Sequence, residues 1–246
     1  MQRPPEQDAD LPRLQIGGGD RVSEWLRQAA RSLGVTVDRT ASSSIVPGAE
    51  PRLDGPFHAV HVVRSPHGQV VTYPVAREWF EADALRDVVA PAPGMSATRS
   101  AALQQRAIAY VSEAGILGAA CLRFGPDQMG IPDLTVGVDG SAAWTLDGAT
   151  TPLYENHVRA LLDLPLGTPN LRARAVACCV VRGAPGMFGA LRHCMARDPG
   201  VRVHLEDSPR ESGTTVGHVS VVSDDADDCL RRARHAADYL TGTILE

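Results

Sequence analysis

The stretch Ala143–Gly167 constrains the fold of this chain most, because it combines clear helical periodicity with recognisable ends. Thr150 or Thr151 is predicted to cap a helix here, with Pro152 in its first turn. The apolar positions that follow recur near the helical period, which predicts one buried face. They are Leu153, Tyr154, His157, Val158, Leu161, Leu162 and Leu164. A turn then leads to a predicted buried strand at residues 173–181.

The composition is that of a globular chain with no electrostatic preference for nucleic acid or membranes. Of its 246 residues, 43% are hydrophobic and 22% are charged, so it can bury a core in one or two domains. A formal net charge of −5 argues against a nucleic-acid or membrane-surface partner. No apolar run approaches the roughly 20 residues of a membrane span, and the N-terminus lacks the apolar core of a signal peptide. A cytoplasmic location is therefore expected.

Two residue counts exclude particular chemistries. The chain has 5 cysteines, and the neighbours Cys178 and Cys179 lie in the predicted strand, where successive side chains point to opposite faces. They are predicted to be buried thiols, and no metal site is expected because no cysteine pair has the spacing of a zinc site. Lysine is absent, so all 24 residues counted as lysine or arginine are arginine. Lysine-dependent phosphate grips and Schiff bases are thereby excluded.

The N-terminal region has the pattern of a small βαβ unit after a polar tail. Residues 1–13 are polar and rich in proline, and they are predicted to be disordered. Residues 14–39 are predicted to form a strand, a glycine turn, a helix and a strand that pack against the rest of the chain. Asp20 follows the glycines where a phosphate would bind, so no dinucleotide is expected there. Residues 40–55 are predicted to be a linker.

The central region is predicted to contain a β-hairpin and a second helix. Residues 57–64 and 69–75 have strand patterns on either side of a turn at residues 65–68. Residues 96–114 have the apolar spacing of a helix, and a loop and buried strand follow at residues 115–124. Two histidines of the first strand, His58 and His61, are predicted to face opposite sides and to be surface or core residues rather than ligands.

In three stretches the identities of the residues are more informative than the spacing of the apolar positions. They are Trp144-Thr145-Leu-Asp-Gly-Ala, Tyr154-Glu-Asn-His-Val-Arg-Ala-Leu-Leu and Gly217-His-Val-Ser-Val-Val222. They resemble the end of the ATP-grasp domain and the last domain of carboxyaminoimidazole ribonucleotide synthase, the ATP-dependent carboxylase of purine synthesis. The resemblance implies an α/β (α+β) fold: a partial, vestigial βαβ unit, the back half of an ATP-grasp domain at 56–167 and a small C-terminal α+β domain at 168–246. In residues 57–166 it implies an antiparallel sheet with two helices on one face.

The resemblance also indicates what this chain has lost. The family's glycine-rich flap and its ATP-binding lysines stand where this chain has only the predicted linker, which implies a truncated homologue. At residues 131–145 the family has an asparagine and a glutamate that hold magnesium against ATP, whereas this chain has Pro132 and Asp133. In the last domain, the family's phosphate-binding cations are replaced, which leaves Arg210 as the positive group nearby. The replacing residues are Ser208, Glu211, Thr214 and Thr215. No cofactor and no bound metal are therefore expected.

The remaining polar groups could still line a cleft for a small molecule. The catalytic candidates are Glu78, Asp133 and His218, and the ligand-binding candidates are Asp139, Trp144 and Arg210. The structural alternative for His218 is packing against a helix predicted at residues 225–239.

Three functions remain open on the sequence alone. The first is a repurposed enzyme that acts on a small molecule without ATP, and the second is a non-catalytic binding or regulatory subunit. The third is the family's ATP-dependent carboxylation, which the missing lysines and metal ligands disfavour. The family commonly dimerises, so a homodimer is a further expectation.

Overall fold

The structure is a computed structural model that describes residues 13–16, 21–37, 43–45, 53–125, 133–183, 187–205 and 214–244. Several predictions fall outside these ranges: the tail at residues 1–12, the glycine turn with Asp20, most of the linker, Pro132 and Arg210. Within the described ranges, none of the helices has the length and hydropathy needed to cross a membrane.

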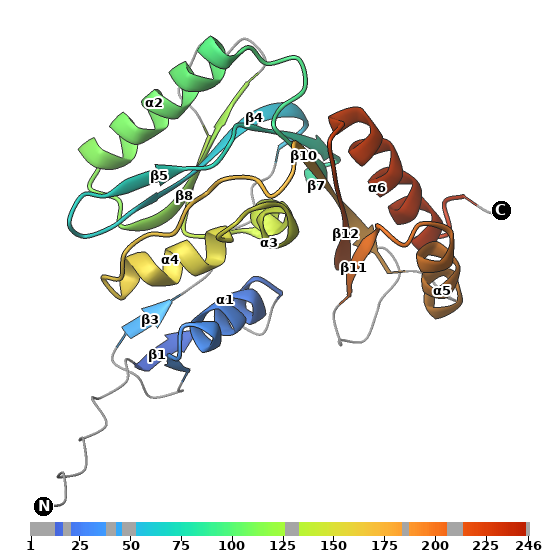
Figure 1. Cartoon of the computed structure of the whole chain (residues 1–246), viewed down its shortest axis with the longest axis horizontal. Helices are drawn as coiled ribbons and strands as arrows, with labels where there is room; N and C mark the ends of the chain where they lie inside the picture. Colours follow the sequence, from blue (N-terminus) through green and yellow to red (C-terminus); the bar gives the residue numbers. More distant parts are fainter. Residues whose placement is uncertain are drawn as a thin grey trace, which may run out of the picture.

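One antiparallel sheet runs through most of the described chain and continues across residue 167, where a domain boundary is predicted (Figure 1). Its strand order is β11 (Arg202–Leu205), β12 (Thr215–Ser223), β10 (Ala175–Arg182), β7 (Ala84–Ala90), β6 (Ala76–Glu81), β4 (Gly55–Arg64), β8 (Gly118–Phe124) and β9 (Asp133–Val136), with β5 (Val70–Thr72) paired to β4. The predicted antiparallel sheet and the β4–β5 hairpin are confirmed. The pairing of β7 with β10 joins the two predicted domains into one sheet.

The two central helices lie on opposite faces of this sheet. In Figure 1, α2 (Ala97–Glu113) lies on one side of β4 and β8, and α4 (Leu153–Leu161) lies on the other. Val62 of β4 belongs to the core under α2, whereas the next residue, Val63, belongs to the core with α4. Because neighbouring residues of a strand face opposite sides, β4 supplies both cores. The prediction that both helices pack on one face is therefore wrong.

The start of α4 is capped by a residue from outside the helix. Pro152 is the N-cap and makes no side-chain cap bond. The amide N–H of Leu153 instead donates to Oγ1 of Thr145, at 3.1 Å, from the short helix α3 (Trp144–Gly148). The predicted cap at Thr150 or Thr151 is wrong, because the chain folds back and brings α3 against the start of α4.

Replacing Thr145 with valine should therefore lower the free energy of unfolding by about 1–2 kcal/mol, as loss of a cap does. The same hydroxyl also donates to the carbonyl of Ala142 at 2.7 Å, so two hydrogen bonds disappear at one buried position. Urea denaturation measures the loss. The matched control is Thr150→Val, an exposed position, which should change stability by less than about 0.5 kcal/mol. A larger loss in Thr150→Val than in Thr145→Val would contradict this assignment of the cap.

The N-terminal βαβ unit is confirmed and packs against the sheet domain. Its parallel strands β1 (Arg13–Ile16) and β2 (Thr36–Val37) flank α1 (Arg21–Ser32), and β3 (Ser43–Ile45), within the predicted linker, pairs with β1. The Trp25 ring of α1 lies 5.0 Å from that of Tyr154 in α4. An N–H of Arg21 donates to the carbonyl of Gly217 at 3.0 Å. The predicted packing of this unit against the body is confirmed.

The C-terminal strands carry a separate core on their outer face. Helices α5 (Met187–Arg197) and α6 (Ala226–Leu240) lie on that face, on the right in Figure 1. Cys179 belongs to the core under α6 and Cys178 to the core on the other face, so the prediction of buried thiols on opposite faces is confirmed. His218 lies on the Cys178 side of the sheet, with its ring 5.3 Å from that of Trp25. The predicted packing of His218 against the last helix is wrong, because its register places it toward α1.

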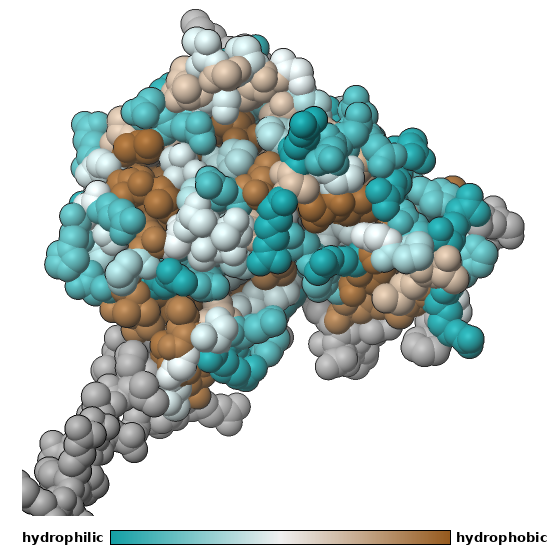
Figure 2. Space-filling model, viewed as in Figure 1, coloured by the Kyte–Doolittle hydropathy of each residue, from teal (hydrophilic) through white to brown (hydrophobic). Residues whose placement is uncertain are grey.

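The surface in Figure 2 mixes hydrophobic and hydrophilic residues on the face viewed. Hydrophobic residues form several patches separated by hydrophilic ones. Large apolar side chains with substantial exposure lie far apart along the chain: Tyr110, Leu117, Val136, Leu164 and Met195. The expected homodimer remains a prediction.

Candidate functional site

Three of the predicted acidic residues gather around an arginine that was not among the candidates. The side chain of Arg123, on β8, is 0% exposed. Its Nε donates to Glu78 at 2.6 Å, its Nη2 to Asp139 at 2.7 Å, and its Nη1 reaches Asp133 at 3.5 Å. Glu78, Arg123, Asp133 and Asp139 are called the Arg123 cluster below. Three elements (β6, β9 and the turn before α3) thus supply carboxylates to one guanidinium.

The remaining N–H groups of the guanidinium are also paired. Nη1 donates to Oγ1 of Thr135 at 2.8 Å, and Nη2 donates to Oγ of Ser141 at 3.0 Å. The amide and hydroxyl of Ser141 in turn donate to Asp139 at 2.9 and 2.6 Å. All five N–H groups of Arg123 therefore have acceptors, the full number that a guanidinium can use.

Burial raises the pKa values of the two buried carboxyl groups in this cluster, whereas the charge of Arg123 lowers them. Burial raises the pKa of Glu78 even against the charge of Arg123. Burial would also raise the pKa of Asp139, but the charges of Arg123 and His61, together with the hydrogen bonds from Ser141 and Arg123, hold that pKa below its usual value. Asp133, with its side chain 37% exposed, is the member that solvent reaches. The guanidinium of Arg123 therefore lowers the pKa of both buried carboxyl groups relative to burial alone.

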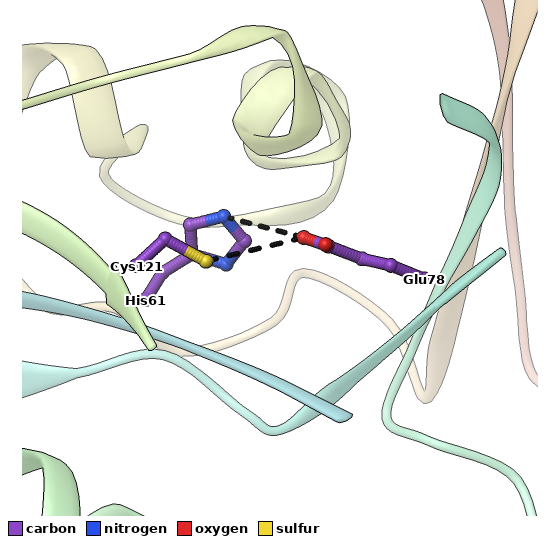
Figure 3. Close-up of side chains that lie close together, drawn as sticks. All are labelled: His61, Glu78 and Cys121. Atoms are coloured by element: carbon purple, nitrogen blue, oxygen red, sulfur yellow. Dashed lines mark hydrogen bonds and ion pairs between the residues drawn. The ribbon is translucent and has the colours of Figure 1, made fainter. Parts of the chain in front are cut away.

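A histidine and a cysteine lie beside the same glutamate. Figure 3 shows His61 and Cys121 on one side of Glu78, with Nε2 of the histidine at 3.9 Å and the thiol sulfur at 4.0 Å from one carboxylate oxygen. Burial lowers the pKa of His61 to about 4, so the ring is neutral near pH 7. Three such groups can hold a metal ion, but the guanidinium bonded to the same carboxylate opposes a second cation there.

A second polar cluster surrounds Asp147 of α3, which is itself buried. His204 Nε2 lies 2.8 Å from Oδ2 of Asp147, the hydroxyl of Ser220 donates to the same oxygen, and Arg202 donates to the other at 3.2 Å. Burial alone would raise the pKa of Asp147, but the bonds from His204 and Ser220 and the charge of Arg202 lower it to about 2. Asp147, Arg202, His204, Ser220 and the adjacent His218 are called the Asp147 cluster.

His218 is the buried member of this second cluster. Its ring stacks on that of His204, with centroids 4.5 Å apart and planes 16° apart. It is 1% exposed, and neither ring nitrogen has a hydrogen-bond partner among the residues that the structure describes. Burial, together with the charges of His204 and Arg21, keeps the pKa of His218 well below its usual value. The ring is therefore neutral, with an unused lone pair.

The Asp147 cluster opens into a cavity of about 300 Å³ between α1 and α4. Asp147 and His204 form part of its wall, and Trp25, Gln28, Tyr154 and Glu155 supply aromatic and polar surface. The side chain of His204 is 38% exposed. A small molecule in this cavity would meet an imidazole held by a carboxylate.

The predicted site is therefore divided between two places. Glu78, Asp133 and Asp139 come together, and Trp144 lies near them but is wholly buried, with its ring 6.1 Å from that of His61. His218 belongs to the other cluster, and Arg210 lies outside the described residues. The functional groups missed in the sequence are Arg123, Asp147 and His204. For Arg123 a signal was available, because a charged residue stands inside the otherwise apolar strand 119–124.

Sequence comparisons relate this chain to N5-carboxyaminoimidazole ribonucleotide synthases. No family model matches it. N5-carboxyaminoimidazole ribonucleotide synthase of Mycobacterium bovis is 32% identical over 188 residues, which cover 73% of this chain and 44% of that protein. The enzyme of Corynebacterium ammoniagenes is 27% identical over 236 residues, covering 91% of this chain and 57% of that protein. The chain thus spans about half the length of the curated relatives it matches.

Solved structures agree with this relation. N5-carboxyaminoimidazole ribonucleotide synthetase from Thermus thermophilus superposes with a TM-score of 0.65 and 26% identity, covering 78% of this chain and 51% of that one. The synthase from Aspergillus clavatus, solved with ADP and 5-aminoimidazole ribonucleotide, has a TM-score of 0.77 at 13% identity and covers 95% of this chain and 99% of that one. The second likeness shows the fold alone.

Proposed function

Because this chain is a homologue of N5-carboxyaminoimidazole ribonucleotide synthase with its mixed α/β, antiparallel-sheet fold, we propose that it uses the fold to act on a small molecule without ATP or magnesium. The observation that carries the proposal is the guanidinium of Arg123, buried among Glu78, Asp133 and Asp139 with every N–H bonded. The positive charge that these three carboxylates contact is therefore the guanidinium of Arg123, a part of the chain itself.

A magnesium ion does not fit the residues of this cluster. The sequence resemblance places the family's metal ligand at Asp133, which Arg123 contacts. An ion at that position would have to displace the guanidinium, which would leave the buried Glu78 and Asp139 without their cation, or lie beside its charge, and both are unfavourable. Phosphoryl transfer also depends on positive groups around the phosphates, and this chain has no lysine to supply them. No step through a bound nucleotide follows from this arrangement.

The cavity beside Asp147 supports chemistry of another kind. In the tautomer whose single ring proton lies on Nε2 and is donated to Asp147, the His204 ring keeps a lone pair on Nδ1. An imidazole held in this way is a general base for a ligand with an acidic proton. Trp25 and Tyr154 give the cavity apolar walls that favour a ring-containing molecule. A repurposed acid–base enzyme is thus the proposed function, and a non-catalytic ligand-binding subunit would use the same cavity.

The homology itself favours a second candidate, the ATP-dependent carboxylation of aminoimidazole ribonucleotide. A related synthase was solved with ADP and that ribonucleotide. In this chain Asp133 remains partly exposed, so it is the residue on which such an activity would depend.

An assay of ADP release separates the two candidates. Wild-type protein with ATP, bicarbonate, aminoimidazole ribonucleotide and either Mg²⁺ or Mn²⁺ is expected to release ADP at the background rate, because the bonded guanidinium excludes the metal. A full-length relative serves as the positive control. ADP release by the wild type that disappears in Asp133→Ala and persists in Asp163→Ala, an exposed position, would contradict the proposal and establish the carboxylase.

A further inference from the structure

We propose that Asp147, His204 and His218 bind one divalent transition-metal ion at the wall of the cavity between α1 and α4. This inference goes beyond the proposed function, because it stands on the contacts of the cluster alone and holds whether or not the cavity is catalytic.

The fold brings the three ligand atoms together from different elements. His204 of β11 and His218 of β12 are directly paired across the two strands, so their side chains leave the same face of the sheet. Asp147 of α3 lies over that face and contacts His204. One ligand atom from each residue lies within 4.8 Å of the other two. Small side-chain rotations around a central ion would close this spacing to the metal–ligand bond lengths of about 2 Å.

The unpaired ring of His218 is an independent observation that points to a ligand. A buried polar group without a hydrogen bond costs about 1–3 kcal/mol, and this ring has two such nitrogens at 1% exposure. Its ring contacts are with Trp25 and His204. Orphaned buried groups in native proteins commonly mark a missing water or ion. A metal bound through one nitrogen of His218 would give the ring its partner.

The donor set selects the class of metal. Two imidazole nitrogens and one carboxylate suit Zn²⁺, Co²⁺, Fe²⁺ or Ni²⁺, whereas Mg²⁺ and Ca²⁺ prefer oxygen ligands. Ser220 and Arg202 donate to the oxygens of Asp147 and fix its orientation, as residues behind metal ligands do. The side chain of Arg202 is 64% exposed, so solvent screens its charge. Because Asp147 and His204 also line the cavity, further coordination positions are open to water or a ligand.

Co²⁺ is the probe for the test, because its visible spectrum reports the number and type of ligands. Full-length protein treated with a chelator and dialysed is titrated with Co²⁺ alone and then with Zn²⁺ as a competitor. One Co²⁺ per chain should bind, with the d–d absorption of a low-coordinate site and no thiolate charge-transfer band. His218→Leu, which removes the orphaned nitrogens, and His204→Ala, at a partly exposed position, should each weaken binding about 100-fold or more. His67→Gln, at a side chain that is 80% exposed, is the matched control and should bind as the wild type does.

Each outcome supports or overturns the proposal. Absence of stoichiometric Co²⁺ binding by folded wild-type protein would overturn it. So would binding that survives in both variants, or binding that carries a thiolate band and disappears in Cys121→Ala, since that result places the ion beside Glu78. Circular dichroism confirms that each variant is folded. The ADP-release assay contains none of these readouts, so failure of the metal proposal and failure of the proposed function are separate results.

Discussion

Replacing Arg123 with methionine is expected to lower the free energy of unfolding by about 3–5 kcal/mol, the usual loss when one partner of a buried ion pair is removed. Methionine fills much of the same volume but leaves Glu78 and Asp139, which are 0% and 1% exposed, without their cation. Urea denaturation followed by circular dichroism measures the change. Arg86→Met is the control: its ion pair with Glu81 is exposed, so the loss should stay below about 1 kcal/mol.

The combined variant Arg123→Met, Glu78→Gln, Asp139→Asn separates charge from packing. If the loss in Arg123→Met comes from uncompensated buried carboxylates, neutralising both of them should recover a large part of it. A single Arg123→Met variant within about 1 kcal/mol of the wild type would show that the guanidinium does not lie among these carboxylates.

Stability is also expected to fall steeply as the pH drops from about 6.5 to 4. Burial lowers the pKa values of His61 and His157 to about 4, whereas both histidines have a value near 6.5 in the unfolded chain. Over this window the unfolded state binds protons that the folded state does not, so lowering the pH favours unfolding. Each histidine should cost about 3 kcal/mol by pH 4. His157 also accepts a hydrogen bond from the amide of Ala119 at 2.9 Å, which its protonated form would break.

Urea midpoints between pH 7.5 and 4.5 measure this dependence. The variant His157→Gln should have a shallower fall than the wild type, since one of the buried histidines with a lowered pKa is gone. The exposed histidine variant His67→Gln should follow the wild-type curve. A wild-type midpoint that does not change between pH 6.5 and 4.5 would contradict the burial of neutral histidines at both positions.

Helices and hairpins were predictable from the sequence where neighbouring residues carry the signal, as apolar spacing and turn residues do. The helix at residues 97–113 followed from apolar spacing, and the β4–β5 hairpin followed from the Pro-His-Gly turn. Strands β6 and β7 were missed because their turn places Ala82 and Asp83 at positive φ without the usual glycine or asparagine. The opposite placement of α2 and α4 depends on which strands pair with β4, which no local pattern contains.

The acidic residues of the candidate site were predictable from the sequence, but the way in which they are brought together was not. Glu78, Asp133 and Asp139 were selected as polar groups in a presumed cleft, and they do meet. Arg123, which unites them, is a charged residue in an apolar strand, and only the pairing of β8 with β4 and β9 shows that it points to these acids. His218 was assigned to the wrong side because the face of a strand residue depends on its register.

The most direct test of the central claim, that a guanidinium stands where a metal and nucleotide would bind, is a crystal structure after soaking with Mn²⁺ and ATP. Anomalous scattering locates the manganese without reference to the protein density. The expected map has no manganese peak between Glu78, Asp133 and Asp139, no nucleotide beside them, and Arg123 still bonded to Asp139. A manganese peak within bonding distance of Asp133, with Arg123 displaced and ATP phosphates at the ion, would contradict the claim.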